Sequence, residues 1–473
     1  MRGLLAMVLV AGSAVAQQTA QPAAPVPTMS LDEVLRTARA ANAALKVPAY
    51  DMAIGEQRRR EALAVNEWKL LGSGDFIYAP GPPFGYDPAI TNLGEERAQV
   101  IATRPIFDGG LRRAAVAAAD AELAGARAGY RIAERDLDLE VRNNYIDAES
   151  ALREIDAHRE GIAQLREYRI LLQSRKSSGM PVQPELLRLD LRLQGEQASI
   201  LQAEARHRQA IEFLNELMGR DPAAPLEVAP LPELVAPSSI PAASLPPSLL
   251  QAPPVATPAP AAPPVATPAP AATLTPPTPA TLTPADEQNP AIAGLPETAI
   301  ALSAVQSAEA KVMLIEAERR FTLGFNADAG LWASDTTHLT PPDRRDLGYS
   351  LNFDFAIPIR DKTYAPRLAQ AKLGIERSRQ NLTVAERNAV LQQTQARTAL
   401  RDIYDEIELL RSMLQSAHDA WLESKSLYLG GSVPFVDVTD AYASWIDSRI
   451  QLGDAEARYR QAEALLLRWT VSP

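Results

Sequence analysis

The sequence contains no cysteine among its 473 residues, and only four histidines. The lack of cysteine excludes disulfides, thiolate metal sites, a cysteine nucleophile and a lipid anchor attached to a cysteine. The histidines are scattered with no ligand spacing, so we expect no metal site. Basic residues are outnumbered by acidic ones, for a net charge of -11, which argues against a nucleic-acid partner. Since neither a Gly-rich phosphate loop nor a Ser-His-Asp order is present, we expect neither an enzyme nor a cofactor. The histidines are His158, His207, His338 and His418.

Long hydrophobic runs are also lacking after the N-terminus. The N-terminal stretch MRGLLAMVLVAGSAVAQ has one basic residue, an apolar run and small residues up to Ala16. This order predicts a signal peptide over residues 1–16 and a mature chain that begins at Gln17. Because no later segment has about 18 uninterrupted apolar residues, the sequence predicts no transmembrane helix. If the mature protein enters a membrane, it must do so as β structure.

Proline is concentrated in one part of the chain. More than half of the 39 prolines lie in residues 222–296, where APPVATPAPA occurs twice in succession. Such a composition favours polyproline II and cannot build a core. We therefore expect a disordered insertion over residues 222–296.

The segments on either side of this insertion, 17–221 and 297–473, repeat one order of elements: helix, two extended segments, long helix, Gly/Pro break, helix. Pro105 matches Pro358, and Gly179 matches Gly431, so the sequence indicates an internal duplication. The expected elements are about 30–67, 70–79, 97–107, 111–177 and up to 219 in the first repeat, and 297–319, 321–332, 346–357, 363–428 and up to 470 in the second.

The extended segments of the second repeat alternate in polarity. In FTLGFNADAGLW the odd-numbered residues from Phe321 to Leu331 are apolar, and in LGYSLNFDFAI so are those from Leu347 to Ile357. This period of two predicts strands with one apolar and one polar face. The pair in the first repeat, LLGSGDFIYA and RAQVIATRPIF, is weaker and Gly-rich.

A single such hairpin would favour a soluble core. Two duplicated hairpins in an exported chain favour a membrane barrel, with aromatic residues at the lipid–water boundary. Four strands cannot close a barrel, since single-chain membrane barrels begin at about eight strands, so several chains are required. The expected boundary aromatics are Trp68, Tyr78, Trp332 and Tyr349.

The long helices are expected to pack as coiled coils. From Leu111 to Ser177 there is no proline, and a helix of that length spans roughly 100 Å. Apolar residues recur at a 4,3 spacing, which specifies helix-on-helix packing; a plain coiled-coil stalk would show the same stripe. The stripes are Val141, Tyr145, Ala148, Leu152, Ile155, Ile162 and Leu165, and Ile403, Ile407, Leu410, Met413 or Leu414, Ala417 and Trp421.

This arrangement resembles the TolC family of outer-membrane efflux channels. The resemblance rests on the duplicated order, on RPIFDGGLRRA and IPIRDKTYAPRLAQA at the strand-to-helix junctions, and on SGMPVQPELLRLD and GGSVPFVDVTDA at the helical tips. It implies a mainly α fold with a membrane β-barrel part. Three copies would form a twelve-stranded barrel in the outer membrane of a Gram-negative bacterium, continued by a coiled-coil α-helical barrel in the periplasm. The implied partners are two further copies of the chain, outer-membrane lipid, a periplasmic adaptor and an inner-membrane pump; the implied role is an efflux or type I secretion channel without chemistry of its own.

The junctions and tips have physical reasons for their residues. Pro105 and Pro358 end strands because proline cannot donate to a ladder, and Gly109 and Gly110 permit the turn into the long helix. At the tips, glycine supplies a positive φ where one helix stops, and proline suits the start of the next. The residues expected in the tip turns are Gly179, Gly430, Gly431 and Pro434, and Pro181 likewise suits the start of the helix after the first tip.

Asp437 and Asp440 lie one helical turn apart and therefore on one face. Alone, such a pair is most often favoured by the helix dipole, and glycosidase-like chemistry would need carboxylates on opposite sides of a cleft. The resemblance implies a third role, the narrowest ring of the channel, where carboxylates would favour cations.

The resemblance further implies a polar network at the tip, with Tyr428 and Glu185 at matching positions. Where the family would place a basic residue, this chain has Val433. Arg188 and Arg175 are the candidate replacements. The chief alternative function is a periplasmic adaptor or structural protein that bridges membranes, which would have one helical hairpin flanked by compact β domains.

Overall fold

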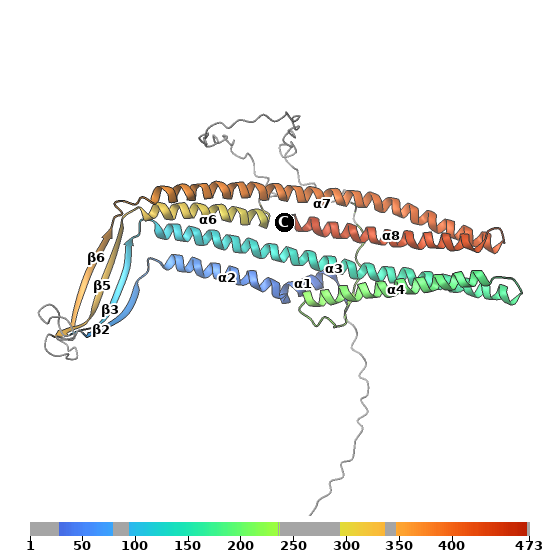
Figure 1. The fold of residues 1–473 in the computed structure, drawn as a ribbon, viewed down its shortest axis with the longest axis horizontal. Coiled ribbons are helices and arrows are strands. Elements are labelled where there is room, and N and C mark those ends of the chain that lie inside the picture. Colours follow the sequence, from blue (N-terminus) through green and yellow to red (C-terminus); the bar gives the residue numbers. More distant parts are fainter. Residues whose placement is uncertain (1–27, 79–93, 235, 237–293, 336–346, 471–473) are drawn as a thin grey trace, which may run out of the picture.

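The protein is an elongated molecule with a β-sheet at one end and long helices running side by side from it, as the computed structural model shows (Figure 1). The structure describes residues 28–78, 94–234, 236, 294–335 and 347–470. The expected signal peptide, most of the expected insertion and His338 lie outside the described residues.

The helices follow the duplicated order expected from the sequence. The first repeat contains α1 (Leu31–Ala41), α2 (Ala43–Ala64), α3 (Leu111–Ser177) and α4 (Gln183–Leu217). The second repeat contains α6 (Pro296–Glu318), α7 (Tyr364–Leu429) and α8 (Phe435–Arg468). With 67 residues, α3 is about 100 Å long.

The helix expected over residues 30–67 is interrupted at Asn42, which differs from the prediction. Asn42 has extended backbone angles, φ -60° and ψ 126°, which stop α1. Its side-chain oxygen accepts a hydrogen bond from the backbone N–H of Ala44 at 2.7 Å and so caps α2. Its side-chain amide donates to the carbonyl of Leu217 at 3.0 Å, which fixes the break against the end of α4.

The sheet contains four antiparallel strands in the order β2-β3-β5-β6. Their bounds are Lys69–Tyr78 for β2, Gly94–Phe107 for β3, Thr322–Asp335 for β5 and Leu347–Ala356 for β6. Pairing of β3 with β5 joins the two repeats, and β2 and β6 form the outer edges.

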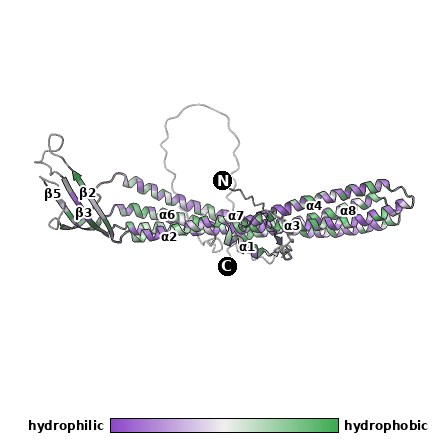
Figure 2. Ribbon diagram, turned by 90° about the horizontal axis from the view of Figure 1, so that it is seen from below, coloured by the Kyte–Doolittle hydropathy of each residue, from purple (hydrophilic) through white to green (hydrophobic). Residues whose placement is uncertain are grey.

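The two faces of the sheet differ in polarity, which confirms the predicted alternation. On one face Phe325 pairs with Phe353, whose ring lies 5.1 Å away, and Tyr349 and Phe355 are 80% and 75% exposed. The opposite face carries hydrogen-bonded polar side chains from β5 and β6: Asn326 with Asp354, Ser350 with Asp328, and Asn352 with Ser350. In Figure 2, hydrophobic residues lie among the strands at this end.

One of the expected boundary aromatics was placed wrongly. Trp332 shares a face with the polar residues Asn326 and Asp328, because even-numbered positions of β5 point away from the apolar face. It packs where a side chain at Gly348 would otherwise lie. Tyr349 does lie on the apolar face.

The long helices form a layer in which α3 is central. It contacts α2 and α6 near the sheet, and α4 and α8 toward the tip, while α7 contacts α6 and α8 (Figure 1). Most residues of the predicted stripes are buried, although Leu152 and Ile403 are half-buried and Met413 is 40% exposed. The buried ones are Val141, Tyr145, Ala148, Ile155, Ile162, Leu165, Ile407, Leu410 and Trp421.

A short strap, made of β1 (Thr28–Met29) and residues 222–234, crosses the middle of the layer. Strand β1 pairs in parallel with β4 (Glu227–Val228). The hydroxyl of Tyr145 lies 2.7 Å from the carbonyl oxygen of Ala229, to which it donates. Residues 222–234 therefore pack on the helices, and the insertion boundary expected at 222 is too early. The prolines of residues 222–234 were counted with the insertion, although they lie in an ordered segment.

Among the described helices, α6 is long and apolar enough to cross a membrane by length and composition alone. It lies in the helical layer between α3 and α7. Near its ends, Glu297 pairs with Arg468 at 3.1 Å and Glu318 with Arg367 at 2.8 Å.

Candidate functional site

Both helical tips end in the same type of turn. Gly179 and Gly431 have positive φ values of 86° and 76°. In each turn an N–H reaches the carbonyl five residues back, from Met180 to Arg175 at 3.1 Å and from Ser432 to Leu427 at 2.9 Å. This is the Schellman pattern, in which a left-handed residue stops the helix.

The neighbouring tip positions differ in their conformation from these glycines. Gly430 is the C-cap residue that follows α7 and has an ordinary helical φ of -77°. Pro434 directly precedes α8 as its N-cap. In the first tip, Pro184 rather than Pro181 lies in the first turn of the next helix.

An apolar core joins all four helices near the tip, and we call it the tip core. These helices form two hairpins: we call α3 with α4 the outer hairpin and α7 with α8 the inner hairpin. The tip core packs the one against the other. The indole rings of Trp421 and Trp445 stack at 4.6 Å, and Val433 packs against the core. The buried members are Leu165, Tyr168, Leu172, Val182, Leu186, Leu189, Trp421, Tyr428, Phe435, Val438, Tyr442, Trp445 and Ile446.

A polar contact between the two hairpins lies at the edge of the tip core. The hydroxyl of Tyr428, from α7, donates to a carboxylate oxygen of Glu185, from α4, at 2.9 Å. The guanidinium of Arg175, from α3, lies 4.7 Å from the centre of the Tyr428 ring. Burial, with Glu185 beside the hydroxyl, raises the pKa of Tyr428 to about 12, so its proton stays in place at neutral pH. The structure thus brings together the two residues expected in the tip network and adds Arg175.

Asp437 and Asp440 lie in the first turns of α8, and both side chains are exposed. They face away from the tip core, which α8 contacts through Phe435 and Val438. In the part of the chain that the structure describes, no cation forms an ion pair with either aspartate. The two carboxylates are therefore available for contacts outside the single chain.

The two strand-to-helix junctions use different turns, but in each an aspartate accepts a hydrogen bond from the N–H two residues farther along. In the first, Gly109 and Gly110 have φ values of 66° and 102°, and Gly109 lies close against the backbone of Ala317. Asp108 accepts from the N–H of Gly110 at 2.9 Å, and this bonding lowers its pKa despite its partial burial.

In the second junction, Asp361 accepts from the N–H and hydroxyl of Thr363, both at 2.7 Å. These bonds lower the pKa of Asp361. Pro105 lies in β3 at an irregularity of the ladder, whereas Pro358 follows the end of β6. The shared aspartate, which sequence analysis missed, was visible three residues after each proline.

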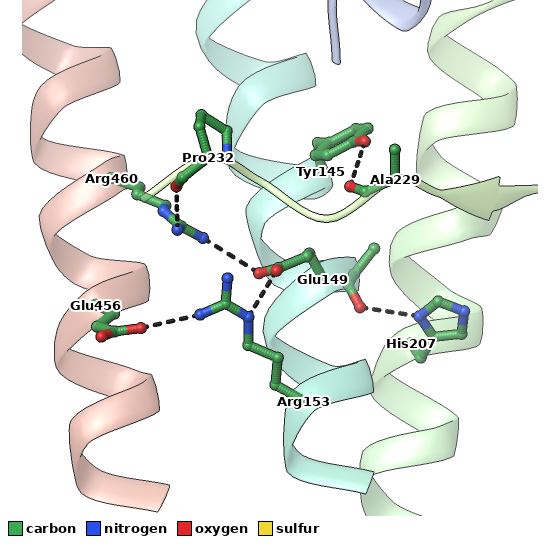
Figure 3. A network of polar contacts seen from close by, with 9 residues as sticks. Tyr145, Glu149, Arg153, His207, Ala229, Pro232, Glu456 and Arg460 are labelled. Atoms are coloured by element: carbon green, nitrogen blue, oxygen red, sulfur yellow. Dashed lines mark hydrogen bonds and ion pairs between the residues drawn. The ribbon is translucent and has the colours of Figure 1, made fainter. Parts of the chain in front are cut away.

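Figure 3 shows a buried ionic network halfway along the helices, which sequence analysis also missed. Glu149 of α3 is 5% exposed and accepts from Arg153 at 2.6 Å and from Arg460 of α8 at 3.3 Å. Arg460 also donates to the carbonyl of Pro232 at 2.8 Å, and Arg153 pairs with Glu456 at 2.9 Å. The network ties both repeats and the strap together.

A second buried ionic cluster lies within the outer hairpin. Nδ1 of His158 on α3 lies 2.6 Å from a carboxylate oxygen of Glu196 on α4, and Nε2 lies 3.7 Å from Glu154. Hydrogen bonding to Glu154 and Glu196 outweighs burial and raises the pKa of His158 to about 9. No group of three or more possible metal ligands occurs among the described residues. The raised pKa keeps His158 protonated at neutral pH, between the carboxylates of Glu154 and Glu196.

This cluster predicts a pH dependence of stability. The pKa of His158 rises from 6.5 to about 9 on folding. A raised pKa stabilises the fold fully below pH 6.5 and loses that contribution as pH rises through about 9, by about 3 kcal/mol. We expect the free energy of unfolding to fall over this range in the wild type. His158→Gln should abolish most of the fall and His207→Gln should keep it; equal slopes in all three proteins would contradict the assignment.

Comparison with known proteins agrees with this architecture. Residues 91–220 match the family described as outer membrane efflux protein. In fold, the chain is similar to CusC, with a TM-score of 0.73, 15% identity and coverage of 94% of this chain and 93% of CusC. It is similar to VceC of Vibrio cholerae, with a TM-score of 0.71, 15% identity and coverage of 93% and 95%. It is also similar to the CmeC outer membrane channel of Campylobacter jejuni, with a TM-score of 0.69, 14% identity and coverage of 93% and 85%.

No curated protein sequence matches the chain at a significant level. The family match covers a segment from before β3 to just after α4, and the structural likeness covers nearly the whole chain. Together they confirm the resemblance to the TolC family of outer-membrane efflux proteins that the sequence predicts.

Proposed function

We infer from the outer-membrane efflux family match and the shared fold that this chain is an exit channel in the outer membrane. In this proposal three copies form a continuous duct that passively conducts substrates delivered by an inner-membrane pump, in an efflux or type I secretion system. The role needs no chemistry from the protein itself.

The observation that carries the proposal is the apolar face of the sheet. Along β6, alternate residues are more than 60% exposed, whereas the opposite face bears hydrogen-bonded polar groups. Exposure of so large an apolar face to water is unfavourable, whereas contact with the hydrocarbon of a lipid bilayer is favourable. The exposed residues of β6 are Leu347, Tyr349, Leu351, Phe353 and Phe355.

Closure by other copies of the chain is supported by the edges of the molecule. Within the described chain β2 and β6 each pair with another strand on one side only. In the hydrocarbon of a membrane, the N–H and C=O groups along their free edges would need hydrogen-bond partners from further strands. Three copies of a four-stranded sheet supply twelve strands, enough for a closed barrel.

The outermost helices of the layer, α2 and α7, both carry stripes of exposed apolar residues. On α2, Val47, Tyr50 and Ile54 are exposed, and on α7 Leu373 and Val384 are exposed. These stripes lie on opposite edges of one chain, so a ring of copies would bring α2 of one copy against α7 of the next (Figure 1).

The helices would extend the duct through the periplasm. A helix of about 100 Å is far longer than the hydrocarbon core of a bilayer, about 30 Å. The tip lies at the end farthest from the sheet (Figure 1). We propose that this end meets a periplasmic adaptor and an inner-membrane pump, as the family resemblance implies.

The exposed aspartates at the tip are proposed as the constriction. Around a threefold axis, Asp437 and Asp440 of three copies would place six carboxylates in one ring. Such a ring attracts cations and repels anions. Their exposure on the face of α8 away from the tip core supports this placement.

The contact between Tyr428, Glu185 and Arg175 is proposed as the latch that keeps the inner hairpin against the outer one. Arg175 supplies the positive charge that the family places near Val433, but from α3 and over the ring face. Val433 contributes apolar packing instead. The latch therefore joins hairpins of the same chain.

Removing the hydroxyl of this latch should open the channel more often. A hydrogen bond to a charged acceptor contributes about 1.5–3 kcal/mol, so Tyr428→Phe weakens the closed state while the ring still packs. We expect higher single-channel conductance or open probability in planar bilayers. Tyr404→Phe, on the same helix and with its ring tilted against that of Tyr459, is the control and should conduct as the wild type. A Tyr428→Phe channel that is indistinguishable from the control would remove the latch.

Cell fractionation tests the proposed function itself. The full chain should be recovered from outer membranes as a trimer that heat dissociates. Release with the soluble periplasm would contradict the channel and favour an adaptor or structural role.

A further inference from the structure

The ends of the sheet and the helices meet in four junction segments that are rich in positive charge. The segments are residues 66–70, 103–113, 316–322 and 357–367, and they contain nine cationic and five acidic residues, a net charge of +4, in a chain of net charge -11. All nine cationic side chains are exposed. We call this surface the junction belt; its cations are Lys69, Arg104, Arg112, Arg113, Arg319, Arg320, Arg360, Lys362 and Arg367.

Contacts between the segments hold the belt together. Arg320 donates to the carbonyl of Gly109 at 3.3 Å, which joins the ends of α6 and β3. The rings of Phe107 and Phe321 stack at 4.5 Å, and the guanidinium of Arg104 lies 5.6 Å from the Trp68 ring centre. The guanidinium of Arg319 lies 5.0 Å from the centre of the Tyr364 ring, so the fourth segment joins the others in one surface at the base of the sheet (Figure 1).

Most of the belt cations have no carboxylate partner within the described residues. In the part of the chain that the structure describes, only Arg367 among the nine forms an ion pair, with Glu318 at 2.8 Å. Arg112 and Arg113 lie in the first turn of α3, at the positive end of the helix dipole, where cations are unfavourable. Arg360 and Lys362 stand just before the start of α7, in the same relation to its dipole. Four of the nine cations thus lie where a helix dipole disfavours positive charge.

The belt borders the apolar face of the sheet. Next to its cations, Leu70, Ile106 and Ile357 are 74%, 53% and 61% exposed, and Ile359 is 96% exposed. Trp68 is 49% exposed and lies beneath Arg104. A protein surface at the boundary between lipid hydrocarbon and headgroups typically combines apolar residues, aromatic rings and cations. The belt and the adjoining sheet have this combination.

We propose that the junction belt binds the headgroups of anionic phospholipids in the membrane leaflet that faces the helices. The proposal rests on the proposed function, since it requires the sheet to lie in a bilayer. Lys69 pairs with Thr103, and Thr103 pairs with Asn326, so Lys69 lies on the polar face of the sheet. Without it the net charge of the segments is +3, and three copies would place +9, three times +3, around the outside of the barrel. A free phosphate would satisfy the cations but would leave the adjoining apolar surface uncovered, whereas a phospholipid covers both. Bound anionic lipid would hold the barrel at a fixed depth.

Native mass spectrometry of the full-length trimer in a neutral detergent tests the proposal. Phosphatidylglycerol and phosphatidylcholine are added at equal amounts, and retained molecules of each are counted. We expect the wild type to retain phosphatidylglycerol in preference. Arg112→Gln, Arg113→Gln and Lys362→Gln together should reduce this preference, by about fivefold for each neutralised cation. Conservative changes to Lys at Arg112 and Arg113 should retain it.

A matched triple variant separates the belt from general charge. Arg131, Arg166 and Arg208 are exposed and form no ion pair within the described residues, but lie along α3 and α4 away from the belt. Their change to Gln should leave the preference unaltered. Equal retention of both lipids by the wild type, or equal losses in the two triple variants, would overturn the proposal. Conductance of the same preparations distinguishes failure of the lipid-binding proposal from failure of the proposed channel function. A wild type that conducts but shows no lipid preference overturns lipid binding by the belt alone. A wild type that never conducts contradicts the channel.

Discussion

Replacing Phe353 with lysine should prevent the protein from accumulating in the outer membrane. Phe353 lies within β6, is 65% exposed and pairs with Phe325 on the apolar face. A lysine on the lipid face of a barrel costs about 2–4 kcal/mol near the bilayer midplane, and a trimer would contain three of them. The measurement is the amount of heat-dissociable trimer in isolated outer membranes, which we expect to fall to background.

The neighbouring position supplies the control for this prediction. Asn352 lies on the polar face, where its side-chain amide donates to Ser350 at 2.8 Å. Asn352→Lys introduces the same charge one residue away but toward the barrel interior, so trimer should remain in the membrane. If both variants accumulate alike, the two faces do not have the environments that we assign to them.

Replacing Arg460 with leucine should lower the free energy of unfolding by about 3 kcal/mol, because it leaves the buried carboxylate of Glu149 with Arg153 as its one cationic partner. It also removes the donor that holds the carbonyl of Pro232, so the strap should loosen at the same time. Thermal or denaturant unfolding measures the loss. Limited proteolysis near residue 232 reports on the strap.

Two further variants define what this loss means. Arg449 lies on the same helix and pairs with Glu160, but both side chains are well exposed, at 35% and 51%, so Arg449→Leu should cost less than about 1 kcal/mol. Combining Arg460→Leu with Glu149→Leu removes both buried charges and should restore most of the stability. A double variant no more stable than Arg460→Leu would show that packing, rather than the unpaired charge, causes the loss.

The sequence predicted regular elements well because their signals are local. The span Leu111–Ser177 was expected as one helix and is one, since it has no proline and keeps an apolar stripe. The strands of the second repeat were recognised by strict alternation, which their register bears out. Asn42 was missed because its effect depends on a cap and on the carbonyl of Leu217, which is 175 residues away.

Contacts between distant helices were beyond the sequence. Glu149 and Arg460 are 311 positions apart, and helical periodicity does not say which charged residue at the edge of a stripe turns inward. The pair Glu185 and Tyr428 was expected through the family resemblance alone. Arg175 was a candidate for the missing cation, and only the folded tip shows its guanidinium over the Tyr428 ring. For Trp332, strand alternation was the better guide, and the aromatic rule misplaced it.

The most direct test of the proposed channel is the reversal potential of the purified trimer in a planar bilayer under a salt gradient. We expect conducting, cation-selective channels, and weaker cation selectivity after Asp437→Asn with Asp440→Asn, whereas Asp447→Asn, farther along α8, should change little. Selectivity unchanged in the double variant would remove these aspartates from the pore. A properly assembled wild-type trimer that never conducts would contradict the account as a whole.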